Sequence, residues 1–270
     1  MSRPWAACRA TPWFPRRGAV QPRRPYQPFA NINQINSPSF QSTTNQLKAG
    51  LEKRYSSGVL ISAEYQFVRA IGTETFQNPF NWNDCRGNLG GIRKHVLVAS
   101  YVIDLPFGKG RRWLSGARGV TDFLAGGWQL AGIMQALSGA PFSPSFETTV
   151  QGSVGGRPDV VLGAPVYPEN RTIARWFNPT AFAVPPNFTF GNAGYNQLWG
   201  PGQFNWDASL VKGFVFKERV TLQLRLEAFG ALNNPQFGNP NGTITNPNVV
   251  GAISSAVGNR TVQLGGKLQF

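Results

Sequence analysis

Apolar and polar residues alternate strictly near the C-terminus of the chain. From Val220 to Ala228 every second residue is apolar, and the residues between them are polar or charged. The pattern returns over 262–270, where Gly265 and Gly266 fit a position of close packing or curvature. An alternation with a period of two puts each set on one face of a strand, whereas a helix would scatter both sets. Both segments are therefore predicted to be strands of a sheet with two different faces.

The same alternation, in weaker form, predicts further strands upstream. We expect them over residues 29–34, 46–52, 59–67, 95–105, 128–136 and 204–214. The first of these is short and irregular, and 95–105 is apolar on both faces. Lys212 interrupts the apolar face of its strand near one end, where its long side chain could reach an interface. With the two C-terminal segments the chain has about eight predicted strands, most of them long enough to cross a bilayer when tilted.

The predicted connections alternate between short and long. Residues 55–58 and 215–218 form tight turns, and 106–127 form a link of intermediate length, while the long connections span 71–92, 140–203 and 233–259. Bacterial outer-membrane barrels have short periplasmic turns and long extracellular loops. The chain has no run of about 20 apolar residues that could form a spanning helix. The predicted fold class is therefore all-β, an antiparallel transmembrane β-barrel portion with long extracellular loops.

The alternation assigns each strand residue to one of two environments. Residues expected to face lipid are Leu210, Leu222, Leu224, Leu226, Leu264 and Leu268. Residues expected to face the lumen are Glu64, Asp207, Gln223, Arg225 and Glu227. Paired carboxylates can act as acid and base in glycosidases, but alternation already explains where these side chains point. We expect them to form ion pairs or to contact a plug, and Trp128, Tyr101, Tyr65 and Trp206 to be candidates for interfacial girdles.

The composition is unusual for a soluble domain. Only 14% of residues are charged, roughly half the ordinary share, while the chain has 31 glycines and 21 prolines. The formal charge of +14 raises the possibility of a nucleic-acid partner. However, the positive charge is diffuse. Its two clusters lie in a Pro-rich start, residues 1–25, and in the Gly-rich turn at 109–112, and neither is interleaved with aromatic residues on a strand face. Nucleic acid is not expected as a partner.

No residue pattern predicts catalysis, a metal site or a cofactor. Cys8 and Cys85 lack CxxC spacing and accompanying histidines, and the sequence leaves open whether they form a disulfide or two free thiols. His95 is the only histidine and has no carboxylate or cysteine at ligand-like spacing, so it is expected to lie near the extracellular rim. Gly108 and Gly110 match neither phosphate-binding glycine motif and are expected to form a periplasmic turn. The protein is not expected to be an enzyme.

Several segments resemble the C-terminal barrel region of TonB-dependent receptors, in particular the Oar-like group with a carboxypeptidase-regulatory-like N-terminal domain. The matching stretches are LEKRYSSGVLISAEYQF, LPFGKGRRW, GGWQLAGIMQALSGAPF, WFNPTAFAVPP, FGNAGYNQLWGPGQFNWDASLVKGF, LQLRLEAFGALNNPQFGNPNG and the terminal VQLGGKLQF. Together they cover most of residues 26–270 in the order that the family has. Each piece alone is a weak signal.

The resemblance implies a location in the cell outer membrane and a role in the uptake of nutrients energised through TonB. Such receptors have about 22 strands and an internal plug. Since the chain shows no plug, no TonB box and no apolar signal segment at residues 1–18, we expect a fragment that does not transport alone. The expected partners are outer-membrane lipid, the missing plug and strands, TonB through the full-length parent, and the barrel assembly machinery, which would read the terminal Phe270.

Two alternatives of other classes stay open at this point. In a soluble β-sandwich or adhesin-like binding module, the apolar faces would pack against each other instead of facing lipid. The chain could also be the product of a remnant open reading frame that still records its ancestor. The long loop at 140–203 is rich in Pro, Gly and Asn, which favour turns over regular structure. If the protein binds a ligand, contact is expected to begin at this loop and at the loop 233–259.

Overall fold

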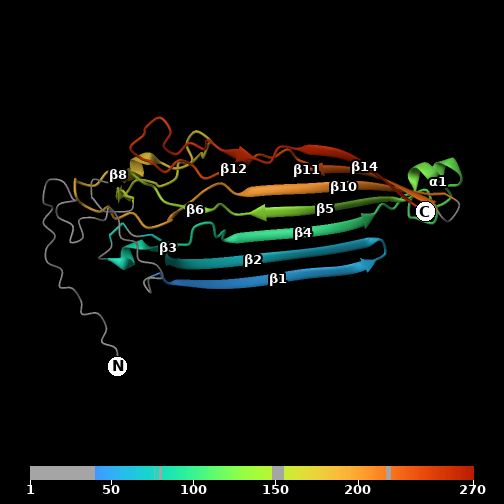
Figure 1. The fold of residues 1–270 in the computed structure, drawn as a ribbon, viewed down its shortest axis with the longest axis horizontal. Helices are drawn as coiled ribbons and strands as arrows, with labels where there is room; N and C mark the ends of the chain where they lie inside the picture. Colours follow the sequence, from blue (N-terminus) through green and yellow to red (C-terminus); the bar gives the residue numbers. More distant parts are fainter. Residues whose placement is uncertain (1–39, 76, 79–80, 148–154, 217–219) are drawn as a thin grey trace, which may run out of the picture.

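A large antiparallel sheet dominates the protein. The computed structural model describes residues 40–75, 77–78, 81–147, 155–216 and 220–270. The sheet has the order β1-β2-β4-β5-β10-β11-β14, and the short β3 (Arg86–Asn88) pairs with β2. The long strands are β1 (Ser42–Ser56), β2 (Val59–Thr73), β4 (His95–Asp104), β5 (Trp128–Leu137), β10 (Gln203–Phe216), β11 (Val220–Phe229) and β14 (Thr261–Gln269). Figure 1 shows them side by side in chain order.

The remaining elements are short and lie in the connections. Three two-stranded sheets pair β6 (Pro141–Phe142) with β9 (Leu198–Trp199), β7 (Asp159–Val160) with β8 (Phe182–Ala183), and β12 (Gln236–Phe237) with β13 (Ala256–Val257). One α-helix, α1 (Val120–Ala125), and the 3-10 helices η2 (Trp82–Cys85) and η3 (Pro179–Ala181) complete the described elements. Within the described residues, no helix has the length and hydropathy needed to cross a membrane.

The long and short connections lie at opposite ends of the sheet, as the sequence predicts. At one end, β1 and β2 are joined by two residues, where Ser57 and Gly58 both have a positive φ. The connections at the other end span residues 74–94, 138–202 and 230–260. Figure 1 shows the C-terminus at the end with the tight turn and α1. This arrangement confirms the antiparallel fold expected for an outer-membrane barrel, and the short-turn end corresponds to the periplasmic side.

The expected strands differ from the observed ones in extent and in one member. β1 begins at Ser42 and ends at Ser56, well beyond the predicted 46–52, because its polar residues also pair with β2. The predicted first strand at 29–34 lies outside the described residues. The eighth strand of the sheet is instead β3, within the predicted 71–92 loop, where Asn88 pairs with Ile71 and extends the β2 edge.

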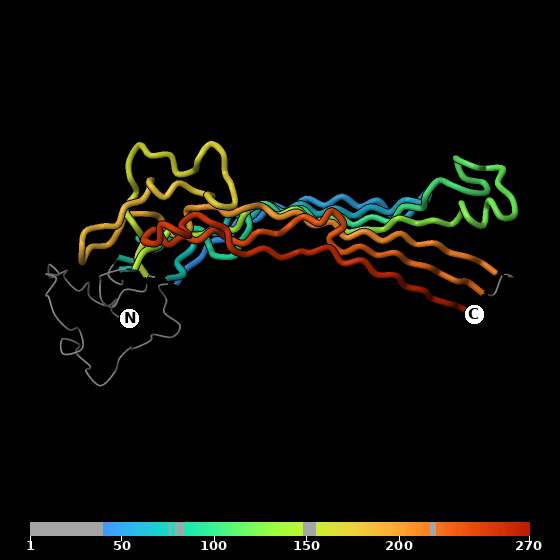
Figure 2. Tube along the Cα trace, turned by 90° about the horizontal axis from the view of Figure 1, so that it is seen from above, coloured from blue at the N-terminus to red at the C-terminus, as the bar shows by residue number. Residues whose placement is uncertain are grey.

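The buried core of the protein lies in the long connections. Phe142, Phe177, Ala181, Phe182, Ala193 and Leu198 form one hydrophobic cluster. Ile244 and Val250, from the 230–260 connection, pack against it. We call the described parts of the three long connections the loop cap. Figure 2 shows the loop cap gathered at one end of the extended strands. The sequence predicted irregular loops here, whereas the structure shows a folded unit with its own core.

Candidate functional site

One face of the sheet is apolar across all of its long strands. Rows of partners in register run across it, such as Ile103, Leu130, Leu210, Leu226 and Leu264. Of the leucines predicted to face lipid, Leu210, Leu226 and Leu264 share this row, while Leu222 pairs with Leu268 and Leu224 with Gly266. All six therefore lie on one face. Many side chains of this face are exposed, including Leu264 at 83%. An exposed apolar face of this size fits contact with lipid.

Aromatic residues mark both ends of this apolar face. On β10 they are Phe204 and Trp206 toward the loop cap and Phe214 toward the short-turn end. Phe204 and Phe214 are ten residues apart in β10, which corresponds to about 33 Å along a strand. At the usual tilt of about 40°, this distance spans about 25 Å of membrane, the height of the apolar band in outer-membrane barrels. The aromatic spacing of β10 therefore matches a bilayer.

Lys212 is the cation that interrupts this face on β10. Its Nζ donates a hydrogen bond to the carbonyl oxygen of Gly126 and lies 5.6 Å from the Trp128 ring centroid and 5.0 Å from that of Phe214. The side chain is buried, with 4% of its surface exposed. The aliphatic part of the side chain thus lies along the apolar face. The ammonium group contacts the Gly126 carbonyl oxygen and the rings of Trp128 and Phe214 at the short-turn end. The predicted reach toward a membrane interface stays a prediction.

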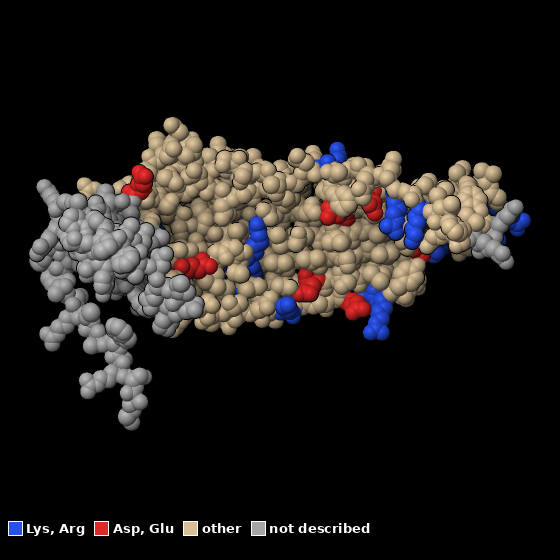
Figure 3. Space-filling model, in the orientation of Figure 1, with Lys and Arg blue, Asp and Glu red and all other residues tan. Residues whose placement is uncertain are grey.

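The opposite face of the sheet carries the polar residues. Every acidic residue of the long strands lies there by register: Glu52, Glu64, Asp104, Asp207 and Glu227. Lys48 lies 3.8 Å from Glu64, and Arg225 lies 3.9 Å from Glu227. Figure 3 shows acidic and basic side chains spread in small groups over the strands of one face. The residues predicted to face the lumen, Glu64, Asp207, Gln223, Arg225 and Glu227, therefore share one face, while an aqueous lumen on that side stays a prediction.

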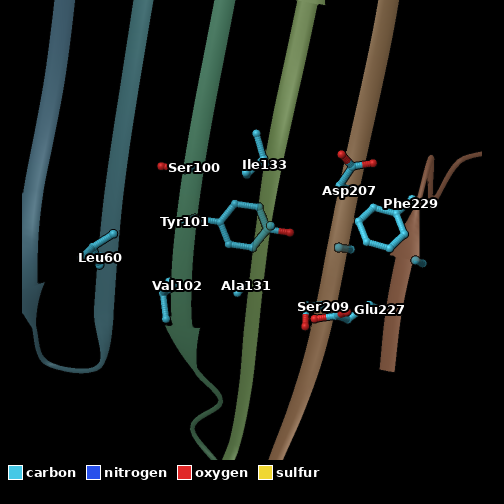
Figure 4. Close-up of a pocket in the computed structure, with 13 residues that line it drawn as sticks. Leu60, Ser100, Tyr101, Val102, Ala131, Ile133, Asp207, Ser209, Glu227 and Phe229 are labelled. Carbon is cyan, nitrogen blue, oxygen red and sulfur yellow. The ribbon is translucent and has the colours of Figure 1, made fainter. Parts of the chain in front are cut away.

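An apolar depression lies within the polar face. It has a volume of about 290 Å³ and is lined by Leu60, Val102, Ala131, Ile133 and Phe229, with Ser100, Asp207, Ser209 and Glu227 at its border. Figure 4 shows Ser209 beside Glu227, its partner in register. The sequence does not reveal this depression, although residues 95–105 are apolar on both faces of their strand. The depression is a place where a small apolar group with a polar edge can lie against the sheet.

A buried ion pair joins two loops of the loop cap. Arg157 Nη2 lies 2.8 Å from Asp84 Oδ2, and the side chain of Arg157 is 7% exposed. Gln77 binds both partners, since its Nε2 donates to Asp84 Oδ2 at 2.8 Å and its Oε1 accepts from the Arg157 backbone nitrogen at 3.1 Å. Removing either charge would leave the other buried and uncompensated. This pair therefore fixes the 74–94 connection to the 138–202 connection.

Tyr195 joins two connections of the loop cap next to the end of β2. Its hydroxyl donates a hydrogen bond to Glu74 Oε2 at 3.0 Å, and Gly90 N donates to the same oxygen at 2.8 Å. Burial raises the pKa of the Tyr195 hydroxyl, and the hydrogen bond to Glu74 raises it further. Nearby, burial lowers the pKa of Arg93, whose Nη1 donates to the carbonyl oxygen of Ser138 at 2.5 Å. These hydrogen bonds join the 74–94 connection to the 138–202 connection close to the ends of β2, β4 and β5.

His95 and Cys85, the residues considered above as candidates for catalysis or metal binding, both contact other side chains or the backbone. His95 lies at the start of β4, at the loop-cap end, and its Nδ1 lies 2.8 Å from the Tyr65 hydroxyl. Cys85 is a buried free thiol whose sulfur accepts a hydrogen bond from Gln77 N at 3.2 Å. Its possible partner, Cys8, lies outside the described residues. The aromatic pair expected at a girdle is also linked, since Trp206 Nε1 donates to the Tyr101 hydroxyl at 2.9 Å.

A sheet with an apolar band between aromatic residues on one face, polar residues on the other, and long loops at one end is the wall of an outer-membrane β-barrel. The family model of the outer membrane beta barrel domain matches residues 7–263. The chain belongs to this family, and its location is the outer membrane. No curated protein and no solved structure matches the chain.

Proposed function

We propose that this chain is the C-terminal part of a TonB-dependent, Oar-like outer-membrane receptor that takes up large or scarce nutrients. The observation that carries the proposal is the loop cap, a unit with its own core and a buried ion pair at the extracellular end of the sheet. A general porin needs only an open mouth, whereas a receptor needs an ordered surface that holds a substrate before passage. In this function the chain supplies barrel wall and the loop cap that binds the substrate, while transport requires the full receptor with its plug and TonB. The chain catalyses no reaction.

The direction of the edge strands supports a place within a larger barrel. β1 and β14 are the two ends of the described sheet, and they run in the same direction because five long strands lie between them. Joining them by antiparallel pairing requires an odd number of further strands. Outer-membrane barrels of single chains have even strand numbers, and transporters have about 22. A receptor barrel would supply such strands.

The polar face and its depression fit a lumen that holds a plug. Ion pairs such as Lys48–Glu64 lie half-exposed on this face, so a second domain could exchange partners with them. The apolar depression around Ile133 and Phe229 would receive an apolar side chain of that domain. TonB would act through the plug and not on the described strands. The plug and TonB are thus the partners of the proposed receptor.

Energy-dependent uptake in the native host would test this function. Cells with the gene intact or deleted would be supplied with labelled iron chelates, oligosaccharides or peptides, with and without a protonophore. We expect uptake of one class to depend on both the gene and the membrane potential. Gene-dependent uptake that persists with the protonophore would identify a passive pore. Equal uptake in the two strains for every class would overturn the transport function.

An adhesin-like binding module of the outer membrane is the second candidate, because the loop cap could also bind a surface without transport. A soluble β-sandwich fits less well. It requires a second large sheet on the apolar face, whereas the other sheets of the described residues are two-stranded and lie in the connections. Binding of a ligand to intact cells without its accumulation inside would favour the adhesin.

A further inference from the structure

The connection between β4 and β5 stands out at the short-turn end. This β4–β5 connection, residues 105–127, is far longer than the two-residue link between β1 and β2. It folds on itself, since Trp113 N donates to the Pro106 carbonyl oxygen at 2.9 Å and Gly108 N donates to the Trp113 carbonyl oxygen at 3.1 Å. The Phe107 and Trp113 rings lie 5.1 Å apart. The connection is therefore an ordered segment with its own hydrogen bonds and aromatic packing.

The β4–β5 connection folds onto the apolar face of the sheet. The ring of Phe123, in α1, lies 4.8 Å from that of Phe214 and 5.9 Å from that of Phe216, two residues of β10. Trp128 Nε1 donates to the Leu124 carbonyl oxygen at 2.9 Å. Figure 2 shows the segment rising to one side of the strands at the end where the C-terminus lies. The connection thus continues the lipid-facing surface at the lower edge of the apolar band.

Large apolar side chains of the connection are exposed. Val120 is 74% exposed, Leu124 60%, Leu114 52% and Trp113 51%. A group of exposed apolar side chains marks a contact surface. Because this group adjoins the lipid-facing band, its burial in the interfacial region of the bilayer would remove it from water without any protein partner. The continuity of the two surfaces therefore points to lipid as the occupant.

Basic side chains accompany this apolar surface. The connection holds Lys109, Arg111, Arg112 and Arg118 against a single acidic residue, Asp122. Arg111 pairs with Asp104 at 3.2 Å, whereas no ion pair is found for the other three cations among the described residues. A groove of about 300 Å³ runs between the connection and β10, with Lys109, Arg111 and Lys212 in its lining. This charge complements the phosphate layer of a membrane.

We propose that the β4–β5 connection is an interfacial anchor that binds anionic phospholipid headgroups of the periplasmic leaflet. Val120 and Leu124 enter the boundary between headgroups and acyl chains, and Trp113 lies at headgroup depth. Lys109, Arg112 and Arg118 bind the lipid phosphates. The proposal rests on the outer-membrane location and not on the receptor function.

The depth of the connection can be measured with spin labels on the full chain reconstituted in phosphatidylcholine vesicles. Labels would replace Val120 or Leu124, and the matched control would be Leu162, which is 95% exposed in the loop cap. We expect labels at 120 and 124 to be reached by oxygen and shielded from a water-soluble nickel chelate, with the reverse at 162. Equal exposure to the chelate at all three positions would overturn the anchor.

The charge requirement can be measured separately, through the preference of the reconstituted protein for spin-labelled phosphatidylglycerol over phosphatidylcholine. Arg112→Gln/Arg118→Gln should lower this preference by up to about fivefold for each arginine removed. The control Arg175→Gln/Arg260→Gln removes the same charge from the loop-cap end and should leave the preference unchanged. An equal loss in both variants would show a general charge effect, and no loss in either would show that these arginines do not bind lipid. Both results would overturn the headgroup site.

Discussion

The hydroxyl group of Tyr101 occupies the space in which a side chain at position 132 would begin. A Cβ atom at Gly132 would lie 2.6 Å from the Tyr101 oxygen and 2.7 Å from the Asp207 carbonyl oxygen. The same hydroxyl accepts the hydrogen bond from Trp206 Nε1 at 2.9 Å. Because Gly132 has no side chain, Tyr101 of β4 and Trp206 of β10 can contact each other across β5 on the apolar face. Gly132 is a packing requirement of this part of the barrel wall.

Gly132→Ala should therefore destabilise the folded protein. The added methyl group forces Tyr101 or the β10 backbone to move, which costs about 1–3 kcal/mol of unfolding free energy in a packed site. Gly213→Ala is the matched control. Gly213 is also a strand glycine, in β10, but a Cβ atom built on it would have no neighbouring atom within 4 Å. Urea unfolding in lipid vesicles measures both. Equal stability of the two variants would show that Tyr101 yields without cost.

The register of β14 predicts opposite outcomes for neighbouring positions. Leu264 pairs with Leu226 on the apolar face, whereas Gln263 pairs with Glu227 on the polar face. Leu264→Arg should cost about 2–4 kcal/mol of folding free energy in a bilayer. Gln263→Arg gains an opposite charge beside Glu227 and should be tolerated. Comparable losses in vesicle unfolding would mean that the lipid and lumen faces are assigned wrongly.

The ion pair between Arg157 and Asp84 should decide the stability of the loop cap. Asp84→Asn leaves a cation that is 7% exposed without its partner, which typically costs about 3–5 kcal/mol. Glu52→Gln breaks an ion pair with Arg54 whose side chains are 70% and 93% exposed, and it should change nothing measurable. Limited proteolysis of the loop cap would compare them. A loop cap equally resistant in both variants would contradict a structural role for the pair.

The loop cap should loosen in alkaline solution through Tyr195. The pKa of this hydroxyl in the folded protein lies above its ordinary value of 10.0, so the folded state holds the proton more tightly than the unfolded state. Its contribution to stability is complete below about pH 10 and is lost as the pH rises through the folded-state pKa. Tyr195→Phe should reduce this loss. Amide exchange in the 74–94 connection, followed against pH in both proteins, measures the difference.

The sequence predicts where most strands lie. It predicts only in part which residues of neighbouring strands contact their polar side chains. Alternation alone places Leu224 and Gln223 on opposite faces of the sheet, and the register places them so too. The sequence makes Gln223 look like a site that tolerates arginine. In the structure it pairs with Lys267 and accepts a hydrogen bond from Arg225, so a third cation there would be repelled. Cross-strand neighbours depend on register, which a single strand does not reveal.

The loop cap and the β4–β5 connection could not be predicted because their contacts have no period. Phe177 and Leu198 are fully buried although they lie among prolines, glycines and asparagines. Their burial comes from partners far along the chain, which local patterns do not encode. The sequence does not predict α1 either. Its six residues, which lie between glycines, are too few to show the helical spacing of apolar residues. The sequence does not reveal the apolar depression because Ile133 alternates with the apolar residues of its strand, in the same set as Gln129 and Gln135, and Leu60 lies between two apolar neighbours.

Phe270 offers a clean test of how the barrel is inserted. The resemblance to TonB-dependent receptors implies that the terminal aromatic residue is read by the assembly machinery, and aromatic belts offer the alternative of a simple interfacial anchor. In the structure Phe270 is 98% exposed, so its ring makes almost no contact with the rest of the chain. Deleting it should therefore remove an assembly signal without removing internal packing. We expect slower insertion into membranes that contain the machinery and little change in urea stability after refolding in pure lipid.

Phe216→Ala is the matched control for Phe270, because it removes another aromatic ring from the apolar face at the same end of the sheet. Phe216 lies 5.9 Å from Phe123, so its loss should lower stability in pure lipid. It is internal to the chain and should not be read as a terminal signal, so the insertion rate should stay near that of the wild type. A signal and an anchor thus give opposite patterns in the two assays. If deletion of Phe270 lowers stability as much as Phe216→Ala and leaves the insertion rate unchanged, Phe270 is an anchor and the signal hypothesis is wrong.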